Sequence, residues 1–96
     1  MPYELPWWAE SKLRGVTREE VDQVLTARRR WPRPSTGGPV RVTLIAGRTL
    51  AGRPVVVAVR EVAPFQSLIV AAGELSGDDL AAFEQWEASS DEPYQG

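Results

Sequence analysis

The sequence predicts one small α+β domain, in which helices pack on a single antiparallel sheet. Capping signals and apolar residues at helical spacing occur near both ends of the chain, whereas β-branched runs with short turns fill its middle. The length of 96 residues allows one modest core. We predict the order α-α-β-β-β-α, with three or slightly more strands, over residues 1–88. An acidic, flexible tail is predicted at residues 89–96.

Two helices are predicted in the N-terminal third of the chain. The first is short, about residues 8–13, and Gly15 ends it. The second begins after Thr17, because Thr17 and Glu20 have the spacing of a capping box. Pro32 ends this helix, since proline disfavours helical backbone in the residue before it. The buried face of the second helix is predicted from an apolar stripe at helical spacing, formed by Val21, Val24 and Leu25.

Three strands are predicted in the middle of the chain. Residues 40–49 begin with a period-two alternation of apolar and other side chains, which is typical of a strand. The segment LAGR at 50–53 predicts a hairpin turn, with Gly52 at positive φ. Residues 54–62, PVVVAVREV, predict the central and most buried strand, and residues 67–72 predict the third. The short connections favour an antiparallel meander.

The last predicted helix begins at Ser76 and extends to about Ala88. Ser76 and Asp79 have the spacing of a capping box, with Asp in place of the usual Glu. The residues that share one apolar face of this helix are Leu80, Phe83 and Trp86.

The composition excludes several kinds of chemistry. The chain has no cysteine and no histidine, so a disulfide, a thiol nucleophile and a Ser-His-Asp triad are impossible. We predict no metal site and no cofactor. The N-terminus MPYELPWW lacks the pattern of a signal peptide, and no apolar run reaches the length of about 18 residues that would suggest a membrane span. These features predict a cytoplasmic chain with no membrane partner.

The net charge of −2 hides a strong asymmetry along the chain. Residues 1–60 hold all 11 Lys and Arg residues and five acidic residues, a balance of +6, whereas residues 61–96 hold eight acidic residues and no basic one. This split is typical of a basic binding face with an acidic partner or tail. The alternative is that the two halves neutralise each other across the fold.

Arginines gather at the end of the second predicted helix and along the strands. Residues 28–30 are predicted in the last helical turn, where cations interact favourably with the helix dipole. The planar guanidinium group suits phosphate, and a neighbouring tryptophan can stack on a base. We therefore predict a surface that binds RNA or a protein partner, formed by Arg28, Arg29, Arg30, Trp31, Arg33, Arg41 and Arg60.

Three segments resemble the BrnT-like branch of the RelE/ParE toxin superfamily: KLRGVTREEVDQVL, LIAGRTLAGRPVVVAV and IVAAGELSGDDLAAF. The resemblance covers roughly residues 7–86. It implies a RelE-like fold, with a small antiparallel sheet, two N-terminal helices and one C-terminal helix. It also implies a metal-independent endoribonuclease from a type II toxin–antitoxin module, whose partners would be RNA and an acidic antitoxin-like chain.

The chain departs from the family pattern at residues that would carry the chemistry. Arg14 stands where a histidine is frequent, Gly73 replaces an arginine after the last strand, and Phe83 replaces a tyrosine. Cleavage by attack of the 2′-hydroxyl needs a base, an acid and stabilisation of negative charge. Only Glu61 or Glu74 remains as a base. The remaining candidate catalytic residues are Arg14, Arg48 and Arg53.

Two functional hypotheses follow from the sequence. The first is a toxin-like protein that acts on RNA as a ribonuclease or an RNA-binding protein, with its catalysis either retained or lost. The second is a non-catalytic interaction or regulatory module on the same fold, which binds an acidic protein or another copy of itself.

Overall fold

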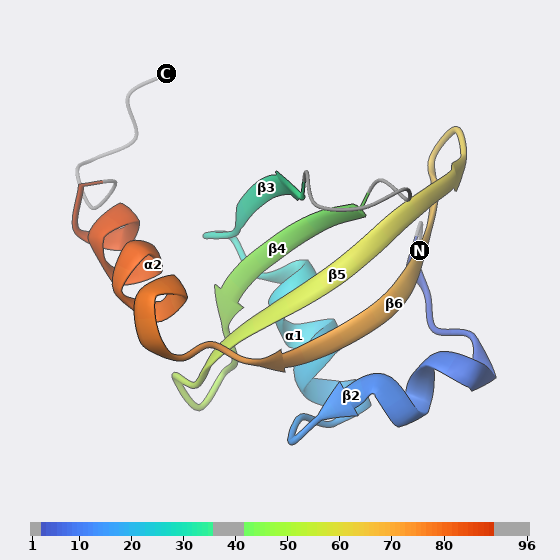
Figure 1. The fold of residues 1–96 in the computed structure, drawn as a ribbon, viewed down its shortest axis with the longest axis horizontal. Coiled ribbons are helices and arrows are strands. Elements are labelled where there is room, and N and C mark those ends of the chain that lie inside the picture. The colour runs from blue at the N-terminus through green and yellow to red at the C-terminus, as the bar shows by residue number, and fades with distance from the viewer. Residues whose placement is uncertain (1–2, 36–41, 90–96) are drawn as a thin grey trace.

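The computed structural model describes residues 3–35 and 42–89, which form an α+β fold with one mixed sheet (Figure 1). The strands are β1 (Tyr3–Glu4), β2 (Leu13–Arg14), β3 (Trp31–Ser35), β4 (Val42–Arg48), β5 (Pro54–Ala63) and β6 (Gln66–Glu74). The helices are the 3₁₀ helix η1 (Trp7–Lys12) and the α-helices α1 (Arg18–Thr26) and α2 (Gly77–Ser89). The strand order is β1-β6-β5-β4-β3, and β2 also pairs with β6.

The α+β class and the central meander are as predicted. Strands β4, β5 and β6 pair antiparallel, and β5 lies in the middle of the sheet. Gly52 has φ 89° in the turn between β4 and β5, so the predicted hairpin is confirmed. A second tight turn joins β5 to β6, and there Phe65 has φ 63°.

The predicted order α-α-β-β-β-α with about three strands is wrong, because the residues that the structure describes form a sheet of six. Two of the additional strands, β1 and β2, are each two residues long and run parallel to β6. Such short segments gain their strand conformation from the neighbour they pair with rather than from their own residues. The first predicted helix is found as η1, between these two strands.

Strand β3 corrects a second prediction. Residues 31–35 contain Pro34 and also Pro32, which was predicted to end a helix, but they form the edge strand beside β4. Proline has no backbone N–H, so Trp31, Arg33 and Ser35 must supply the amide donors to β4. Both prolines therefore face the free edge and remove donors from it, which blocks addition of another strand.

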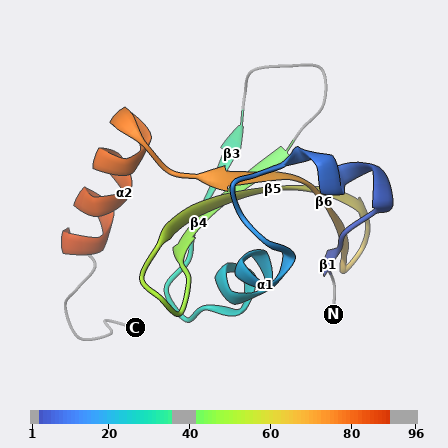
Figure 2. The ribbon, with the colours of Figure 1, turned by 90° about the horizontal axis from the view of Figure 1, so that it is seen from below.

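One face of the sheet packs on α1, which lies beneath it in Figure 2. The inward side chains of β5 alternate along the strand and are all buried: Val55, Val57 and Val59. They meet the predicted apolar stripe of α1, formed by Val21, Val24 and Leu25, in one hydrophobic cluster. Burying a side chain of this size contributes about 1.5–3 kcal/mol, so this layer is the main core of the domain.

The start of α1 confirms the capping box in atomic detail. The Glu20 amide donates to the Thr17 hydroxyl at 3.1 Å, and the Thr17 amide donates to a Glu20 carboxylate oxygen at 2.9 Å.

The end of α1 differs from the prediction. The helix stops at Thr26, so residues 28–30 lie in the connection to β3 and not in the last helical turn.

Helix α2 packs against one end of the opposite sheet face, to the left in Figures 1 and 2. Phe83 is its one buried residue, and Leu80 and Trp86 pack beside it as predicted. Gly77 has φ 58° at its first position. None of the helices in the described ranges is long and apolar enough to cross a membrane.

Substitution of Gly47 tests the close approach of α1 to β4. A Cβ atom at Gly47 would lie 3.1 Å from a methyl group of Val24. Val24 is fully buried and its branched side chain has little rotamer freedom. We expect Gly47→Ala to lower the free energy of unfolding by about 1–3 kcal/mol, the usual effect of overpacking. Urea denaturation would measure this change.

Gly73→Ala is the matched control, because a Cβ there meets nothing closer than 3.8 Å. The penalty of Gly47→Ala should shrink in a Val24→Ala background, since the clashing methyl group is gone. An equal loss of stability in both glycine variants would contradict this account.

Candidate binding face

The sheet face opposite α1 is the candidate functional site, and we call it the open face. Strand registers place the side chains of alternate residues on it: Trp31, Arg33, Leu44, Ala46, Arg48, Val56, Ala58, Arg60, Ala71 and Arg14. Helix α2 covers only one end of this face, and no helix lies over its middle (Figure 2). Of the described residues of β2 to β6 that the register places on this face, none is acidic, whereas β1 adds the carboxylate of Glu4, opposite Leu68, at the edge of the face.

An apolar trough of about 210 Å³ occupies the middle of the open face. Its floor is aliphatic and formed mainly by Leu44, Val56, Ala58 and Ala71, which are half-buried. Lys12 and Arg14 stand at its edge. The strand predicted to be the central and most buried one, β5, buries Val55, Val57 and Val59 towards α1, whereas Val56 and Ala58 on the open face are half-buried. The trough can receive an apolar group while the rim contacts a negative charge.

Arg33 carries an unsatisfied donor on the same face. Its guanidinium carbon lies 4.1 Å from the centre of the Trp31 ring, a cation–π contact. The Arg33 Nε is buried and has no hydrogen-bond acceptor among the described residues. A buried donor left without an acceptor costs about 1–3 kcal/mol, so this position favours binding of an anion that supplies one.

The Trp31 ring already has partners inside the protein. It stacks on Trp86 with 5.7 Å between ring centroids, and on Phe83 at 6.3 Å. The guanidinium of Arg29 lies 5.5 Å from the Trp86 ring, and an Arg29 Nη2 donates to the Glu87 backbone carbonyl at 2.7 Å. This aromatic stack attaches α2 to the sheet, so Trp31 acts first as a packing residue.

Arg48 is held by α2. Its Nε and Nη2 donate to the two carboxylate oxygens of Glu87 at 2.9 and 2.8 Å, and its Nη1 donates to the Gly52 carbonyl at 2.9 Å. The Glu84 carboxylate lies 4.0 Å away. The hydrogen bonds from Arg48 lower the pKa of Glu87 and raise that of Arg48. This bidentate fork occupies the geometry with which arginine would bind a phosphate.

Arg53 is held on the other face of the sheet. Its Nη1 lies 3.0 Å from both carboxylate oxygens of Glu20, and its Nε lies 3.5 Å from Glu74. Its Nη2 donates to the Gly15 carbonyl at 2.5 Å. The pKa of Glu20 is lowered, most of all by the hydrogen bond from the Thr17 amide and next by the hydrogen bond from Arg53. Arg53 thus joins the start of α1 to the end of β6.

The candidate catalytic arginines therefore do not form one cluster. Arg48 turns towards α2 on the open face, whereas Arg53 turns towards α1. Arg14 is exposed beside the trough. Of the two candidate bases, Glu74 is paired with Arg53. Glu61 lines a separate pocket of about 300 Å³, where no described lysine or arginine contributes to the lining.

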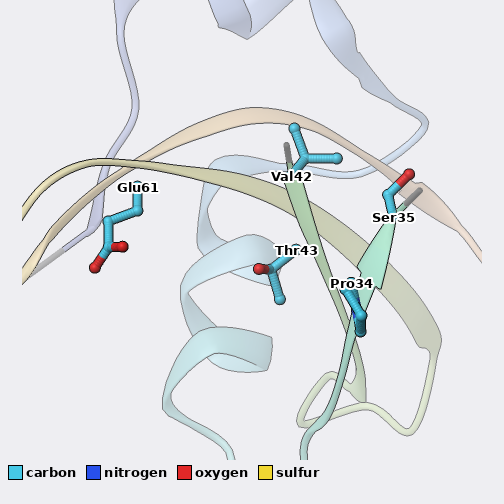
Figure 3. Close-up of a pocket in the computed structure, with 5 residues that line it drawn as sticks. All are labelled: Pro34, Ser35, Val42, Thr43 and Glu61. Carbon is cyan, nitrogen blue, oxygen red and sulfur yellow. The ribbon is translucent and has the colours of Figure 1, made fainter. Parts of the chain in front are cut away.

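Figure 3 shows the pocket that contains Glu61, with its lining residues on β3, β4 and β5. Glu61 and Thr43 are its polar residues on β5 and β4, and Ser35 lies at the end of β3. A carboxylate without a neighbouring cation can accept a proton but cannot stabilise the negative charge that develops on a cleaved phosphate. The described residues of this pocket therefore do not by themselves form a cleavage site.

The predicted binding residues separate into three groups. Arg33 and Arg60 belong to the open face, and Arg29 contacts α2. Arg28 and Arg30 line a recess on the α1 side of the sheet. Arg41 lies outside the described residues. The predicted cluster of arginines is thus dispersed, because the irregular connection after Thr26 turns successive side chains to different faces.

The sequence analysis did not identify two parts of the open face: the carboxylate that binds Arg48 and the floor of the trough. Glu87 was not singled out, although its spacing from Phe83 and Trp86 on a predicted helix put it near their face. The floor of the trough was missed because the run PVVVAVREV was predicted to be the most buried strand, without assigning its residues to two faces. Its period-two alternation separates Val56 and Ala58 from the other valines.

In the part of the chain that the structure describes, no group of three or more His, Cys, Asp or Glu side chains could hold a metal ion. The chain matches no protein-family model, and neither the curated proteins nor the solved structures provide a match. Its function must therefore be argued from its own geometry.

The two carboxylates with lowered pKa values predict loss of stability in acid. Both groups bind fewer protons in the folded than in the unfolded state near their usual pKa of 4.5. Their contribution is complete above that value and is lost as the pH falls through the folded pKa. We expect Glu20→Gln and Glu87→Gln each to flatten the fall of the urea midpoint between about pH 5 and about pH 3. Glu19→Gln, at an exposed position, is the control. A slope unchanged in both variants would contradict the role of these pairs.

Proposed function

We propose that this chain is a toxin-like protein, similar in kind to the RelE and BrnT toxins, that binds RNA on its open face and has lost cleavage. The observation that carries the proposal is a sheet face with several cations and no acidic residue among the described positions of β2 to β6, so that Glu4 at the β1 edge is the acid its strands contribute. Neutralisation of phosphates by such cations supplies most of the affinity of proteins for nucleic acid. A cytoplasmic location is part of the proposal.

Loss of cleavage is supported by the state of the candidate catalytic groups. Arg48 and Arg53 are already bound to carboxylates of the same chain, so neither presents a free fork to a phosphate. Glu74 is bound to Arg53, and no described lysine or arginine lines the pocket of Glu61. Arg14 alone remains exposed beside the trough, and an arginine cannot act as a base near neutral pH.

RNA binding is tested with a fluorescent single-stranded oligonucleotide titrated at several salt concentrations. We expect the logarithm of the affinity to fall with the logarithm of salt by about 0.7 per phosphate contacted. Arg14→Ala and Arg33→Ala should each weaken binding by about two- to fivefold and reduce that slope. Arg18→Ala, an exposed arginine of α1, is the matched control.

Glu87→Gln should have the opposite effect on RNA binding from the arginine variants. It removes the charge that holds Arg48 and keeps the shape of the side chain. It should strengthen RNA binding by about two- to fivefold. Equal binding by all variants, or binding that does not depend on salt, would exclude the open face as the RNA site.

Catalysis is tested by expressing the chain alone in a bacterial host while growth and bulk RNA integrity are followed. We expect normal growth and intact RNA. Growth arrest with fragmented RNA would show that cleavage survives. In that case Arg48→Ala and Arg53→Ala should abolish it if these arginines stabilise the cleaved phosphate, whereas toxicity retained by both would remove them from the site.

A second candidate function is the non-catalytic interaction module, and the aliphatic floor of the trough favours it. No described aromatic side chain lines the trough, although aromatic rings are the usual platform for unpaired bases. An acidic, antitoxin-like segment with an apolar side, or a second copy of the chain, would then occupy the face. Light scattering on the purified chain separates self-association from a monomer that needs another partner.

A further inference from the structure

A second recess lies on the α1 side of the sheet, away from the open face. It has a volume of about 240 Å³ and is lined by Tyr3, Arg28, Arg30, Pro32 and Ile45. These residues come from β1, from the connection after α1, and from β3 and β4. Ile45 pairs with Val57, which faces α1, so its side chain lies on that side as well. The fold therefore brings together groups that are distant in the sequence.

Among the described lining residues, two arginines supply the charge of this recess. Arg28 and Arg30 are its only described lining residues with a charge, and no carboxylate shares the lining. The intervening Arg29 turns away to Glu87 and Trp86 on α2. A guanidinium flanked by another and by no acid attracts an anion from solution.

The two guanidinium groups differ in how they are held. An Arg30 Nη1 donates a hydrogen bond to the carbonyl of Leu25 in the last turn of α1, which holds that group at the wall of the recess. Arg28 is exposed, and no hydrogen bond or ion pair to another described residue is found for it. The guanidinium group of Arg30 is thus positioned before a ligand binds, and that of Arg28 is available to contact the ligand.

The remaining walls are apolar with one hydroxyl. Ile45 is buried, Pro32 is exposed, and the half-buried Tyr3 packs on the core beneath the sheet. A phenolic hydroxyl can donate to or accept from a bound group. The recess therefore combines a strongly cationic side with a compact apolar side, and a matching ligand has an anionic head on a small apolar or flat body.

We propose that this recess binds a phosphate monoester. A monoester carries a charge of about −1.5 to −2 near neutral pH, which two guanidinium groups can balance, whereas a carboxylate carries one charge. Arginine forks match the oxygen geometry of phosphate. The recess is smaller than the roughly 300 Å³ at which pockets for drug-sized ligands begin, so it takes a small ester or only the terminal phosphate of a longer strand. The proposal does not depend on RNA binding at the open face.

The first test is titration of the full chain with phenyl phosphate, followed by NMR chemical shifts or calorimetry. We expect saturable binding, with phenol and inorganic phosphate each weaker by at least about tenfold, since each lacks one half of the ligand. Arg28→Gln and Arg30→Gln should each weaken phenyl phosphate by about tenfold or more, the effect of losing a charge-assisted hydrogen bond. Tyr3→Phe should weaken it less.

Two controls keep these results interpretable. Arg18→Gln removes an exposed arginine of α1 that does not line the recess and should leave the affinity unchanged. Arg33→Gln alters the open face and should also leave it unchanged. Thermal unfolding of every variant checks that the fold is retained. Phenyl phosphate that binds no tighter than phenol, or an Arg18→Gln loss equal to that of Arg28→Gln, would overturn the proposal.

A second arm separates the two sources of the phosphate. A short single-stranded RNA is compared with and without a 5′-phosphate, in the wild-type chain and in Arg28→Gln. A preference for the phosphorylated strand that Arg28→Gln removes and Arg33→Gln keeps assigns the recess to strand ends. Equal binding of both strands, together with binding of phenyl phosphate, assigns it to small free esters.

Discussion

The structure depends on the packing of α1 against the valines of β5. This contact buries the inward residues of the central strand and fixes which side of the sheet is closed. Gly47 permits it, because any larger residue there would meet Val24. The capping box at Thr17 sets where α1 begins, and the ion pair between Glu20 and Arg53 ties that start to the turn before β5. The helix, the turn and the strand therefore form one unit.

Closing one face leaves the other exposed over most of its area. Helix α2 lies over one end only and is attached through a stack of Trp31, Phe83 and Trp86 together with the Arg48–Glu87 pair. The rest of the face keeps an aliphatic floor with cations near it. Because Pro32 and Pro34 remove amide donors from the β3 edge, they disfavour extension of the sheet by a partner at that edge.

The asymmetry of charge along the chain is only partly neutralised by the fold. Arg48 and Arg53 of the basic part pair with Glu87 and Glu74 of the acidic part. Arg14, by contrast, stays exposed beside the trough. Internal ion pairs therefore remove the arginines that a cleavage site would need, while the surface keeps cations that suit binding.

The sequence by itself determined the local features. The capping box, the stripe of α1, the turn at Gly52 and the strand over 54–62 depend on neighbouring residues, so their patterns were sufficient to predict them. The same holds for the apolar side of α2.

Tertiary structure alone decided the features that depend on distant partners. Strand β3 forms in spite of two prolines because β4 supplies its pairing, and β1 and β2 exist only beside β6. The direction of each arginine after Thr26 was likewise undetermined, since an irregular connection has no period from which a face can be predicted. Pairing of distant strands and the path of that connection placed the arginines on three separate surfaces, and no local pattern records either of them.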